Sequence, residues 1–199
     1  MLFLTLIALA SSQYIFEAVN SKVYRAYKSG ECYYYSAKCH KFGISNSAVT
    51  LSEGSSCNDD DLTAVTVPAN TYTFGDHIPV YDFNDTYYEN SVCENVIQNS
   101  LPVTTYYMAE CVPSTNKKDS VKYELTKIAV TKYTYIGNTK CGNTPKETVS
   151  YEYNACISIN STRNILTKED GYDKRHPDNN NDSAVSFSLL ALLFLAFTL

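Results

Sequence analysis

The stretch Thr148–Asn160, TVSYEYNACISIN, decides the fold class, because its side chains change character at every second position. The apolar or aromatic set is Val149, Tyr151, Tyr153, Ala155, Ile157 and Ile159. The residues between them are mostly small or polar. Side chains of a strand point alternately to the two faces of a sheet. This period of two therefore predicts one long strand with a buried face and a solvated face.

The composition outside this stretch also favours strands over helices. The chain has 18 Tyr and no Trp. Leucine, the best apolar helix former, occurs in residues 11–183 only at Leu51, Leu62, Leu101, Leu125 and Leu166. Thr, Val, Ser and Tyr, which are common here, suit a pleated and half-buried surface. We therefore expect an all-β domain, an antiparallel sandwich reinforced by disulfides.

Further strands are predicted from short apolar or aromatic runs separated by turn residues. They cover Tyr14–Val19, Lys22–Lys28, Cys32–Ser36, Ala48–Ser52, Leu62–Val67, Ile78–Phe83, Val103–Val112 and Val121–Ile136. The run Val103–Val112 is apolar on both faces, as a central strand would be. The run Val121–Ile136 changes the phase of its alternation, which predicts a bulge or a division into two strands.

Residues 1–10, MLFLTLIALA, are predicted to be a cleavable signal peptide. This run has the length of a signal-peptide core, roughly 7–15 residues, and it ends in a small-x-small pattern, Ala8-Leu9-Ala10. It is shorter than the roughly 20 residues that a spanning helix needs. The alternative is a buried N-terminal strand, but such a strand would alternate or stop at about 4–8 residues.

Residues 184–199 form an uncharged apolar tail, which predicts a signal for a glycosylphosphatidylinositol (GPI) anchor. No Lys or Arg follows the tail, and the small polar residues Asn179–Ser183 precede it. Asn181 is the predicted attachment residue, although the spacer behind it is shorter than the usual length of about 8–12 residues. A short C-terminal membrane helix and a buried helix are the alternatives, because the length criteria overlap.

Between the two ends, residues 11–162 are predicted to form one extracellular domain and residues 163–183 a polar stalk. The formal net charge of −5 lies entirely in this middle segment, because neither apolar end carries a charged side chain. The segment contains no basic cluster that could follow a phosphate backbone. This balance argues against nucleic acid as a partner.

The middle segment contains seven cysteines, at Cys32, Cys39, Cys57, Cys93, Cys111, Cys141 and Cys156. In an exported chain they predict disulfides. The odd number leaves one thiol that is free or joined to a second molecule, and a disulfide-linked dimer is therefore an option. We expect bridges between sequence neighbours, Cys93–Cys111 and Cys141–Cys156. The third bridge and the odd cysteine are then expected among the first three cysteines.

N-glycosylation is predicted at Asn84 and Asn160, whose tripeptides match the acceptor pattern and lie near predicted turns. Asn181 also matches this pattern, but there glycosylation competes with the attachment of the anchor.

We expect no catalytic site, cofactor or metal site, because no known catalytic or nucleotide-binding motif occurs. Cys39 and His40 are adjacent, and neighbouring residues of a strand point to opposite faces. They are therefore poorly placed to act as nucleophile and base. Acidic residues such as Asp59 and Asp85 could serve glycoside hydrolysis, but nothing in the sequence brings them together.

The two end signals, together with the Tyr–turn–Cys segments Tyr27–Cys32 and Tyr135–Cys141, give the chain a recognisable architecture. It resembles the small, cysteine-bearing, GPI-tailed surface proteins of amoebae, the ponticulin-like kind among them. The resemblance matches no functional residue, so it implies an architecture and a location but no activity.

The sequence thus predicts a protein held by a lipid anchor on the extracellular face of the plasma membrane. We expect it to act without catalysis, in binding, coating or adhesion, with an extracellular glycan or protein as its ligand. One alternative is a membrane-anchored extracellular hydrolase whose site the motifs do not reveal. The other is a single-pass membrane protein with a short C-terminal helix.

Overall fold

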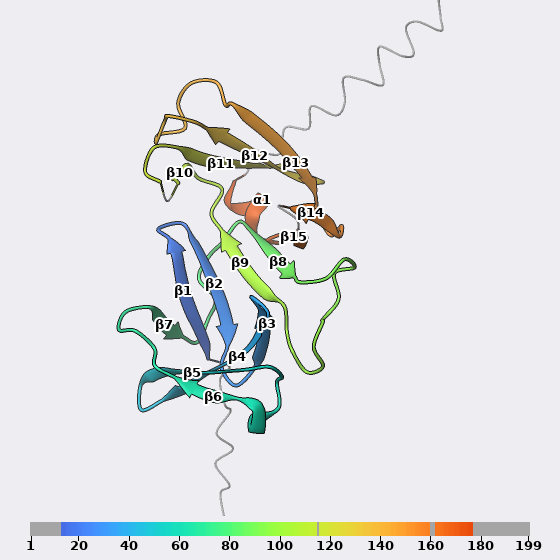
Figure 1. The fold of residues 1–199 in the computed structure, drawn as a ribbon. Coiled ribbons are helices and arrows are strands. Elements are labelled where there is room, and N and C mark those ends of the chain that lie inside the picture. Colours follow the sequence, from blue (N-terminus) through green and yellow to red (C-terminus); the bar gives the residue numbers. More distant parts are fainter. Residues whose placement is uncertain (1–12, 115, 160–161, 177–199) are drawn as a thin grey trace, which may run out of the picture.

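The computed structural model describes residues 13–176 apart from residues 115, 160 and 161. In this part of the chain nearly all regular structure is β-strand, arranged in one seven-stranded and two four-stranded sheets (Figure 1). All pairings between neighbouring strands of these sheets are antiparallel. The expected all-β, antiparallel architecture is confirmed.

The seven-stranded sheet forms the middle of the molecule and has the strand order β14-β15-β8-β9-β2-β1-β7. Its strands are β1 (Tyr14–Asn20), β2 (Val23–Lys28), β7 (Tyr72–Gly75), β8 (Phe83–Tyr88), β9 (Val103–Tyr107), β14 (Ile157–Ile159) and β15 (Thr162–Lys168). Strand β9 lies between β8 and β2. The central position predicted for Val103–Val112 is thus confirmed for the first half of that run.

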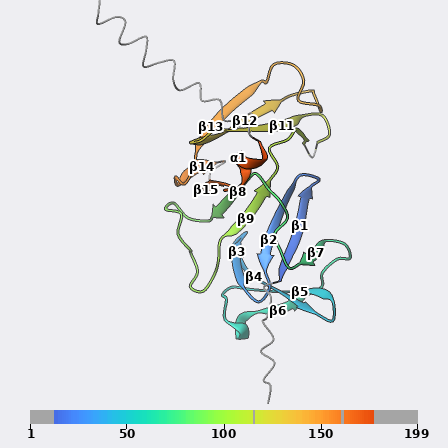
Figure 2. The ribbon, with the colours of Figure 1, turned by 180° about the vertical axis from the view of Figure 1, so that it is seen from behind.

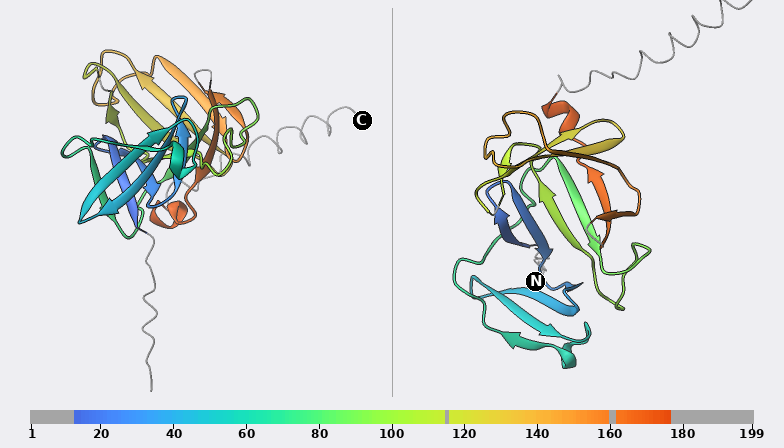
Figure 3. Two further views of the ribbon diagram at one scale, coloured as in Figure 1. Left: turned by 60° about the horizontal axis from the view of Figure 1, so that its bottom comes forward. Right: turned by 45° about the horizontal axis from the view of Figure 1, so that its top comes forward.

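Two smaller sheets lie at opposite ends of the middle sheet (Figures 1, 2 and 3). The lower sheet of Figure 1 consists of β3 (Cys32–Tyr35), β4 (Lys38–Ser45), β5 (Ala48–Gly54) and β6 (Thr63–Val65). The upper sheet consists of β10 (Val112–Pro113), β11 (Ser120–Leu125), β12 (Ala129–Tyr135) and β13 (Glu147–Glu152).

Two short helices complete the described elements, a 3-10 turn η1 (Asp59–Asp61) and a single α-helical turn α1 (Tyr172–Arg175). Neither of them, and no other helix of the described segment, has the length and apolar character needed to cross a bilayer.

The lower sheet and the middle sheet enclose a first core, made by Ile15, Tyr27, Tyr33, Phe42, Leu51 and Val103. Its centre is the ring of Phe42, which is fully buried and stacks on Tyr27 with 4.0 Å between the ring centroids. Burying a side chain of this size contributes about 1.5–3 kcal/mol. This end of the sandwich is therefore held chiefly by aromatic packing.

The upper sheet and the middle sheet enclose a second core, made by Phe83, Leu125, Val130, Leu166 and Tyr172. Strand β9 serves both cores, because Val103 belongs to the first core and Tyr107, four residues on, packs against the second. Both smaller sheets therefore pack on the same face of the middle sheet.

Between the two cores, the inward face of the middle sheet is polar. A row of paired residues crosses it from β1 to β8: Glu17 opposite Arg25, Arg25 opposite Thr105, and Thr105 opposite Asp85. Arg25 Nη1 donates to Glu17 Oε2 at 3.1 Å, and the Tyr27 hydroxyl donates to the same oxygen at 2.8 Å. These bonds satisfy the carboxylate at the boundary of the first core.

The strand predicted over Thr148–Asn160 is divided in two, and this part of the prediction is wrong. The chain leaves the upper sheet after β13, turns at Tyr153–Asn154, and enters the middle sheet as β14. Asn154 takes φ 56°, a left-handed conformation that Asn tolerates, and its N–H donates to Leu166 O at 2.8 Å. The alternation still marks burial, since Tyr151, Tyr153, Ile157 and Ile159 all pack against the second core.

The polar stalk predicted from residue 163 is also wrong for the described residues, because they belong to the domain. Strand β15 pairs with β8 on one side and β14 on the other, and it buries Asn164 and Leu166. The segment read as polar because it contains Arg163, Asn164 and Lys168, although Asn164 lies on the buried face of the strand. Residues 177–183 of the predicted stalk, with the whole apolar tail, lie outside the described residues.

Several strand boundaries differ from those predicted. Strand β8 begins at Phe83, where the predicted strand Ile78–Phe83 ends, and β4 and β7 were not predicted at all. The run Val121–Ile136 does divide into two strands, β11 and β12. They are joined by a turn in which Thr126 Oγ1 accepts hydrogen bonds from Ile128 N and Ala129 N.

The turn α1 is fastened to the sheet by a buried carboxylate, Asp82, which is only 1% exposed. Asp82 Oδ2 accepts a hydrogen bond from Ala109 N at 2.7 Å, and Oδ1 lies 3.2 Å from Arg175 Nη2. Arg175 Nη1 also donates to Glu169 Oε2 at 2.7 Å. A buried carboxylate is costly unless it is paired and hydrogen-bonded, so these contacts hold α1 in place against the middle sheet.

Replacing Arg175 with alanine leaves the Asp82 carboxylate without its guanidinium partner. We expect the free energy of unfolding to fall by about 1–3 kcal/mol, the usual cost of a buried polar group that loses its partner. Urea denaturation with the disulfides intact measures this. Arg163→Ala is the matched control, because Arg163 forms no ion pair with any described residue, and it should change stability by less than about 0.5 kcal/mol. Equal losses in the two variants would contradict the role given to Asp82.

Candidate functional site

A cavity of about 350 Å³ lies between the middle sheet and the upper sheet, beside the second core. Its lining combines aromatic rings with a few polar groups: Phe83, Asp85, Tyr107, Tyr123, Lys132, Tyr151, Ile159, Thr162, Asn164 and Leu166. Ligand pockets in proteins are typically apolar and aromatic hollows of about 300–1,000 Å³ with a small number of placed polar groups. The cavity has this character and is the candidate site.

The one carboxyl group in the lining belongs to Asp85 on β8, which the register turns inward with Phe83 and Tyr87. Asn164 on β15, 4% exposed, donates from Nδ2 to Asp85 Oδ1 at 2.7 Å. Asn164 Oδ1 in turn accepts a hydrogen bond from the Thr162 hydroxyl at 2.8 Å, which fixes the orientation of the amide. Among the described residues Asp85 accepts only this hydrogen bond, which leaves Oδ2 available.

Burial raises the pKa of Asp85 to about 6, and the hydrogen bond from Asn164 offsets part of that rise. A charged carboxylate is poorly solvated in this position, so its protonated form is favoured. Asp85 therefore changes charge near neutral pH, whereas an ordinary aspartate is ionised well below it.

Three aromatic rings in the lining pack against one another. Phe83 and Tyr107 stack at 4.7 Å between ring centroids with an interplanar angle of 8°. Tyr123 from the upper sheet meets both rings edge-on, at 5.0 Å and 5.5 Å. Burial raises the pKa of the Tyr107 and Tyr123 hydroxyls well above the ordinary tyrosine value, and the neighbouring Asp85 raises both further. Both hydroxyls therefore stay protonated and can donate hydrogen bonds.

Lys132 brings a positive charge to the same cavity from the upper sheet. It lies opposite Tyr123 in the register of β11 and β12, on the side that faces the middle sheet. Over the described part of the chain Lys132 has no ion-pair partner. An ammonium group that lines a partly enclosed space without a counter-ion is available to an anionic ligand.

A second, smaller hollow of about 200 Å³ lies on the other side of Tyr107 and Tyr123, which line both spaces. Arg25 and Thr105 of the polar row reach it. A third hollow, of about 450 Å³, lies at the edge strand β7 between Val49, Val67 and Phe74. Its lining contains no charged side chain, so it lacks the means to select a charged or strongly polar ligand.

The second carboxylate considered for hydrolysis, Asp59, is far from Asp85 in the fold. Asp59 lies in η1 beside the lower sheet, where Lys41 Nζ donates to it at 2.6 Å. Asp85 lies under the upper sheet. The lining of the cavity thus lacks the pair of carboxylates that glycoside hydrolysis uses, and its groups are suited to holding a ligand.

Within the described segment, six of the seven cysteines form three disulfides, Cys32–Cys57, Cys93–Cys156 and Cys111–Cys141, and Cys39 is free. The predicted bridges Cys93–Cys111 and Cys141–Cys156 are wrong. The placement of the third bridge and the odd cysteine among the first three is confirmed.

The topology explains the corrected pairing. Cys93 follows β8 and Cys156 precedes β14, and these two strands flank β15 in the middle sheet. Cys111 precedes β10 and Cys141 follows β12, in the sheet order β10-β11-β12. Each bridge therefore joins elements that are close in a sheet and separated by 30 or 63 residues in sequence.

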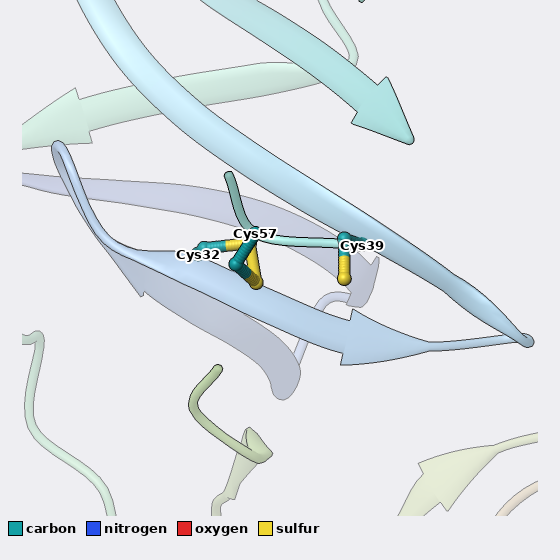
Figure 4. Close-up of side chains that lie close together, drawn as sticks. All are labelled: Cys32, Cys39 and Cys57. Atoms are coloured by element: carbon teal, nitrogen blue, oxygen red, sulfur yellow. A yellow bond between two sulfur atoms is a disulfide. The ribbon is translucent and has the colours of Figure 1, made fainter. Parts of the chain in front are cut away.

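Cys39 and His40 do point to opposite faces of β4, as predicted from the sequence. His40 stacks on Tyr35 with 3.9 Å between ring centroids, and burial lowers the pKa of its imidazole. Cys39 lies on the other face, where its sulfur and those of Cys32 and Cys57 are all within 4.8 Å of one another (Figure 4). The sequence placed a bridge and the odd cysteine among these three residues, but it did not show that the free thiol lies beside the bridge.

Of the two predicted glycosylation sites, Asn84 lies among the described residues and Asn160 does not. Asn84 does not lie near a turn. It sits within β8, paired with Thr167 and Tyr106, and on the face opposite Asp85. Modification of Asn84 stays a prediction. Asn160 and the predicted anchor residue Asn181 lie outside the described residues.

The titration of Asp85 should appear as a pH dependence of stability. A carboxyl whose pKa is raised on folding stabilises the fold fully below its unfolded pKa, near 3.8, and this stabilisation is lost as the pH rises through about 6. The rise of roughly two units corresponds to about 3 kcal/mol. Asp85→Asn is neutral at every pH. Its free energy of unfolding, relative to that of wild type, should therefore be higher at pH 7.5 than at pH 4 by about 2–3 kcal/mol, as measured by urea unfolding.

Asp60→Asn is the control for this measurement, because Asp60 is exposed on η1. It should follow the wild-type pH dependence. If Asp85→Asn followed it as well, the raised pKa of Asp85 would be refuted.

No known protein-family model, curated protein or solved structure matches this chain.

Proposed function

We propose that this chain is an exported protein, held on the outer face of the plasma membrane by a GPI lipid, which binds a ligand without transforming it. The apolar segments at residues 1–10 and 184–199 support the route and the anchor. The three disulfides are compatible with an oxidising, extracellular compartment. The single observation that carries the binding role is the cavity beneath the upper sheet, with its unpaired Lys132 and the buried Asp85–Asn164 pair.

The chemistry of the lining favours an acidic sugar unit as the ligand. Aromatic faces at Tyr107, Tyr123 and Tyr151 provide flat apolar contact for a ring. Asn164 and Asp85 supply hydrogen bonds to hydroxyl groups at one wall. Lys132 supplies a positive charge for a carboxylate or sulfate substituent. A hydroxylated ring with one anionic group uses all three kinds of contact.

The state of Asp85 gives this binding a pH dependence. Below pH 6 Asp85 is neutral, and Lys132 is the one charge in the lining. Above pH 6 the Asp85 carboxylate repels an anionic ligand in the same space. Affinity for an acidic sugar should therefore fall as the pH rises through about 6.

Ligand-observed NMR and calorimetric titration of the purified protein test the proposal, with methyl glucuronide as the acidic probe and methyl glucoside as the neutral one. We expect methyl glucuronide to bind more tightly at pH 5 than at pH 7.5. Lys132→Gln should weaken binding about tenfold, equivalent to about 1.4 kcal/mol, and Asp85→Asn should abolish the pH dependence.

Lys122→Gln is the matched control, because Lys122 lies on the same sheet with its side chain exposed. It should bind the probe as wild type does. Equal binding of both glycosides, or no binding of either at millimolar concentration, would overturn the acidic-sugar assignment.

The anchor is tested separately, by treating cells that express the full chain with a phospholipase that cleaves GPI anchors. We expect the protein to be released into the medium and to end at or near Asn181, as shown by mass spectrometry of its C-terminal peptide. A protein that stays in the membrane fraction and retains Leu199 would contradict the lipid anchor. That result would leave the binding measurements unaffected.

A further inference from the structure

The sulfur atoms of Cys32, Cys39 and Cys57 form a cluster on the outer face of the lower sheet, each within 4.8 Å of the other two (Figure 4). Two of them are joined as a disulfide, Cys32–Cys57, and the third is a thiol. Attack of a thiolate on a disulfide sulfur exchanges the partners of the bridge. The cluster thus holds both reactants of such an exchange.

The fold places the thiol of Cys39 under a short loop. In the register of β4 and β5, Cys39 lies opposite Gly54, and the loop that follows Gly54 carries Cys57 and η1. A Cβ atom on Gly54 would come within 2.1 Å of Asp61 O, so only glycine lets the loop lie this close to the sheet. The result is that Cys39 is 0% exposed and is covered by the segment that carries Cys57.

The same loop is held to the sheet by charge as well as by the disulfide, because Lys41 Nζ on β4 lies 2.6 Å from Asp59 Oδ1. Within the loop, the Ser56 hydroxyl donates to Asp61 Oδ2 at 2.5 Å. Cys32, Cys39 and Lys41 share one face of the β3–β4 hairpin, since Cys32 lies opposite Lys41 and Tyr34 opposite Cys39. The loop therefore stays over the hairpin while one sulfur bond is exchanged for another.

The register also decides which exchange is geometrically allowed. Cys32 and Cys39 are diagonal neighbours in an antiparallel pair, whose Cα atoms lie about 7–8 Å apart. This separation is too long for a disulfide, because the Cα atoms of bridged cysteines are rarely more than about 6.8 Å apart. Cys57 sits on the loop, outside both strands, and is the one member of the cluster that can reach either partner.

We propose that Cys57 is a shared partner, whose disulfide passes between Cys32 on β3 and Cys39 on β4. The Cys39 thiolate attacks Sγ of Cys57, the Cys39–Cys57 bond forms, the Cys32–Cys57 bond breaks, and Cys32 leaves as a thiolate that takes up the proton Cys39 lost. One disulfide and one thiol are present before and after, so no oxidant or reductant is needed. In the first form the loop is tied to β3, and in the second form it is tied to β4.

The free thiol is buried in both forms, since Cys32 is 6% and Cys39 0% exposed. Burial also raises the pKa of the Cys39 thiol, which keeps the thiolate scarce at neutral pH. The exchange is therefore slow at pH 7. As long as the pH is below the pKa of the thiol, each increase of one pH unit raises the rate about tenfold, because only the thiolate attacks.

The proposal is tested with cysteine variants that are secreted by cells able to form disulfides. Each variant is purified and denatured, and its free thiols are counted. Wild type has one free thiol, and Cys39→Ser should have none. Cys32→Ser should also have none, because Cys39 then pairs with Cys57, and peptide mapping should find that bridge. Cys57→Ser should have two, since the two strand cysteines cannot reach each other.

Cys111→Ser is the matched control. It leaves Cys141 without its disulfide partner, and Cys141 has no third cysteine within reach among the described residues. It should contain two free thiols, those of Cys39 and Cys141. Two free thiols in Cys32→Ser, as in this control, would overturn the proposal.

Wild-type protein provides a second test that does not depend on the folding of a variant. The protein is held at pH 7 or pH 9 and the exchange is stopped with acid. It is then unfolded in denaturant in the presence of an alkylating reagent and digested. We expect the label on Cys39 at pH 7, with a share on Cys32 that grows faster at pH 9. A label confined to Cys39 after prolonged incubation at pH 9 would refute the exchange.

Discussion

The constraint on which the structure depends is the continuity of β9 through both halves of the sandwich. Val103 packs into the first core, and Tyr107 packs against the second. Strands β2 and β8 hold β9 in register from either side. A shift of this register by one residue would turn both side chains away from their cores. The upper sheet, the lower sheet and the cavity between layers all take their positions from this register.

Much of the fold could be predicted from alternation and composition, and the failures have local physical causes. Strands β1, β2 and β3 lie where the sequence placed them. The alternation in Thr148–Asn160 identified buried side chains correctly but could not reveal that Asn154 turns the chain from one sheet into another. Strand β15 was taken for a stalk because its buried face carries a polar residue, Asn164, whose partner Asp85 is 79 residues away.

The candidate site was hidden from the sequence for the same reason. Asp85 lies within an Asn-Asp-Thr tripeptide, where attention falls on Asn84, and the two side chains point to opposite faces of β8. Only the pairing of β8 with β15 shows that Asp85 is buried beside an amide donor. Lys132 is equally unremarkable in sequence, since an inward-facing lysine differs from a surface lysine only in the register of its strand. The disulfide partners likewise follow from strand order and not from distance along the chain.

The buried attachment of α1 through Asp82 and Arg175 has a mechanical consequence. If the protein is anchored through residues beyond His176, as proposed, tension on the anchor would enter the domain at α1 and pass along the chain into β15. That strand carries Asn164 and Leu166, which form part of the floor of the cavity. The strand that carries this tension would then also form part of the cavity wall, so the pull would reach the cavity before it reached the lower sheet.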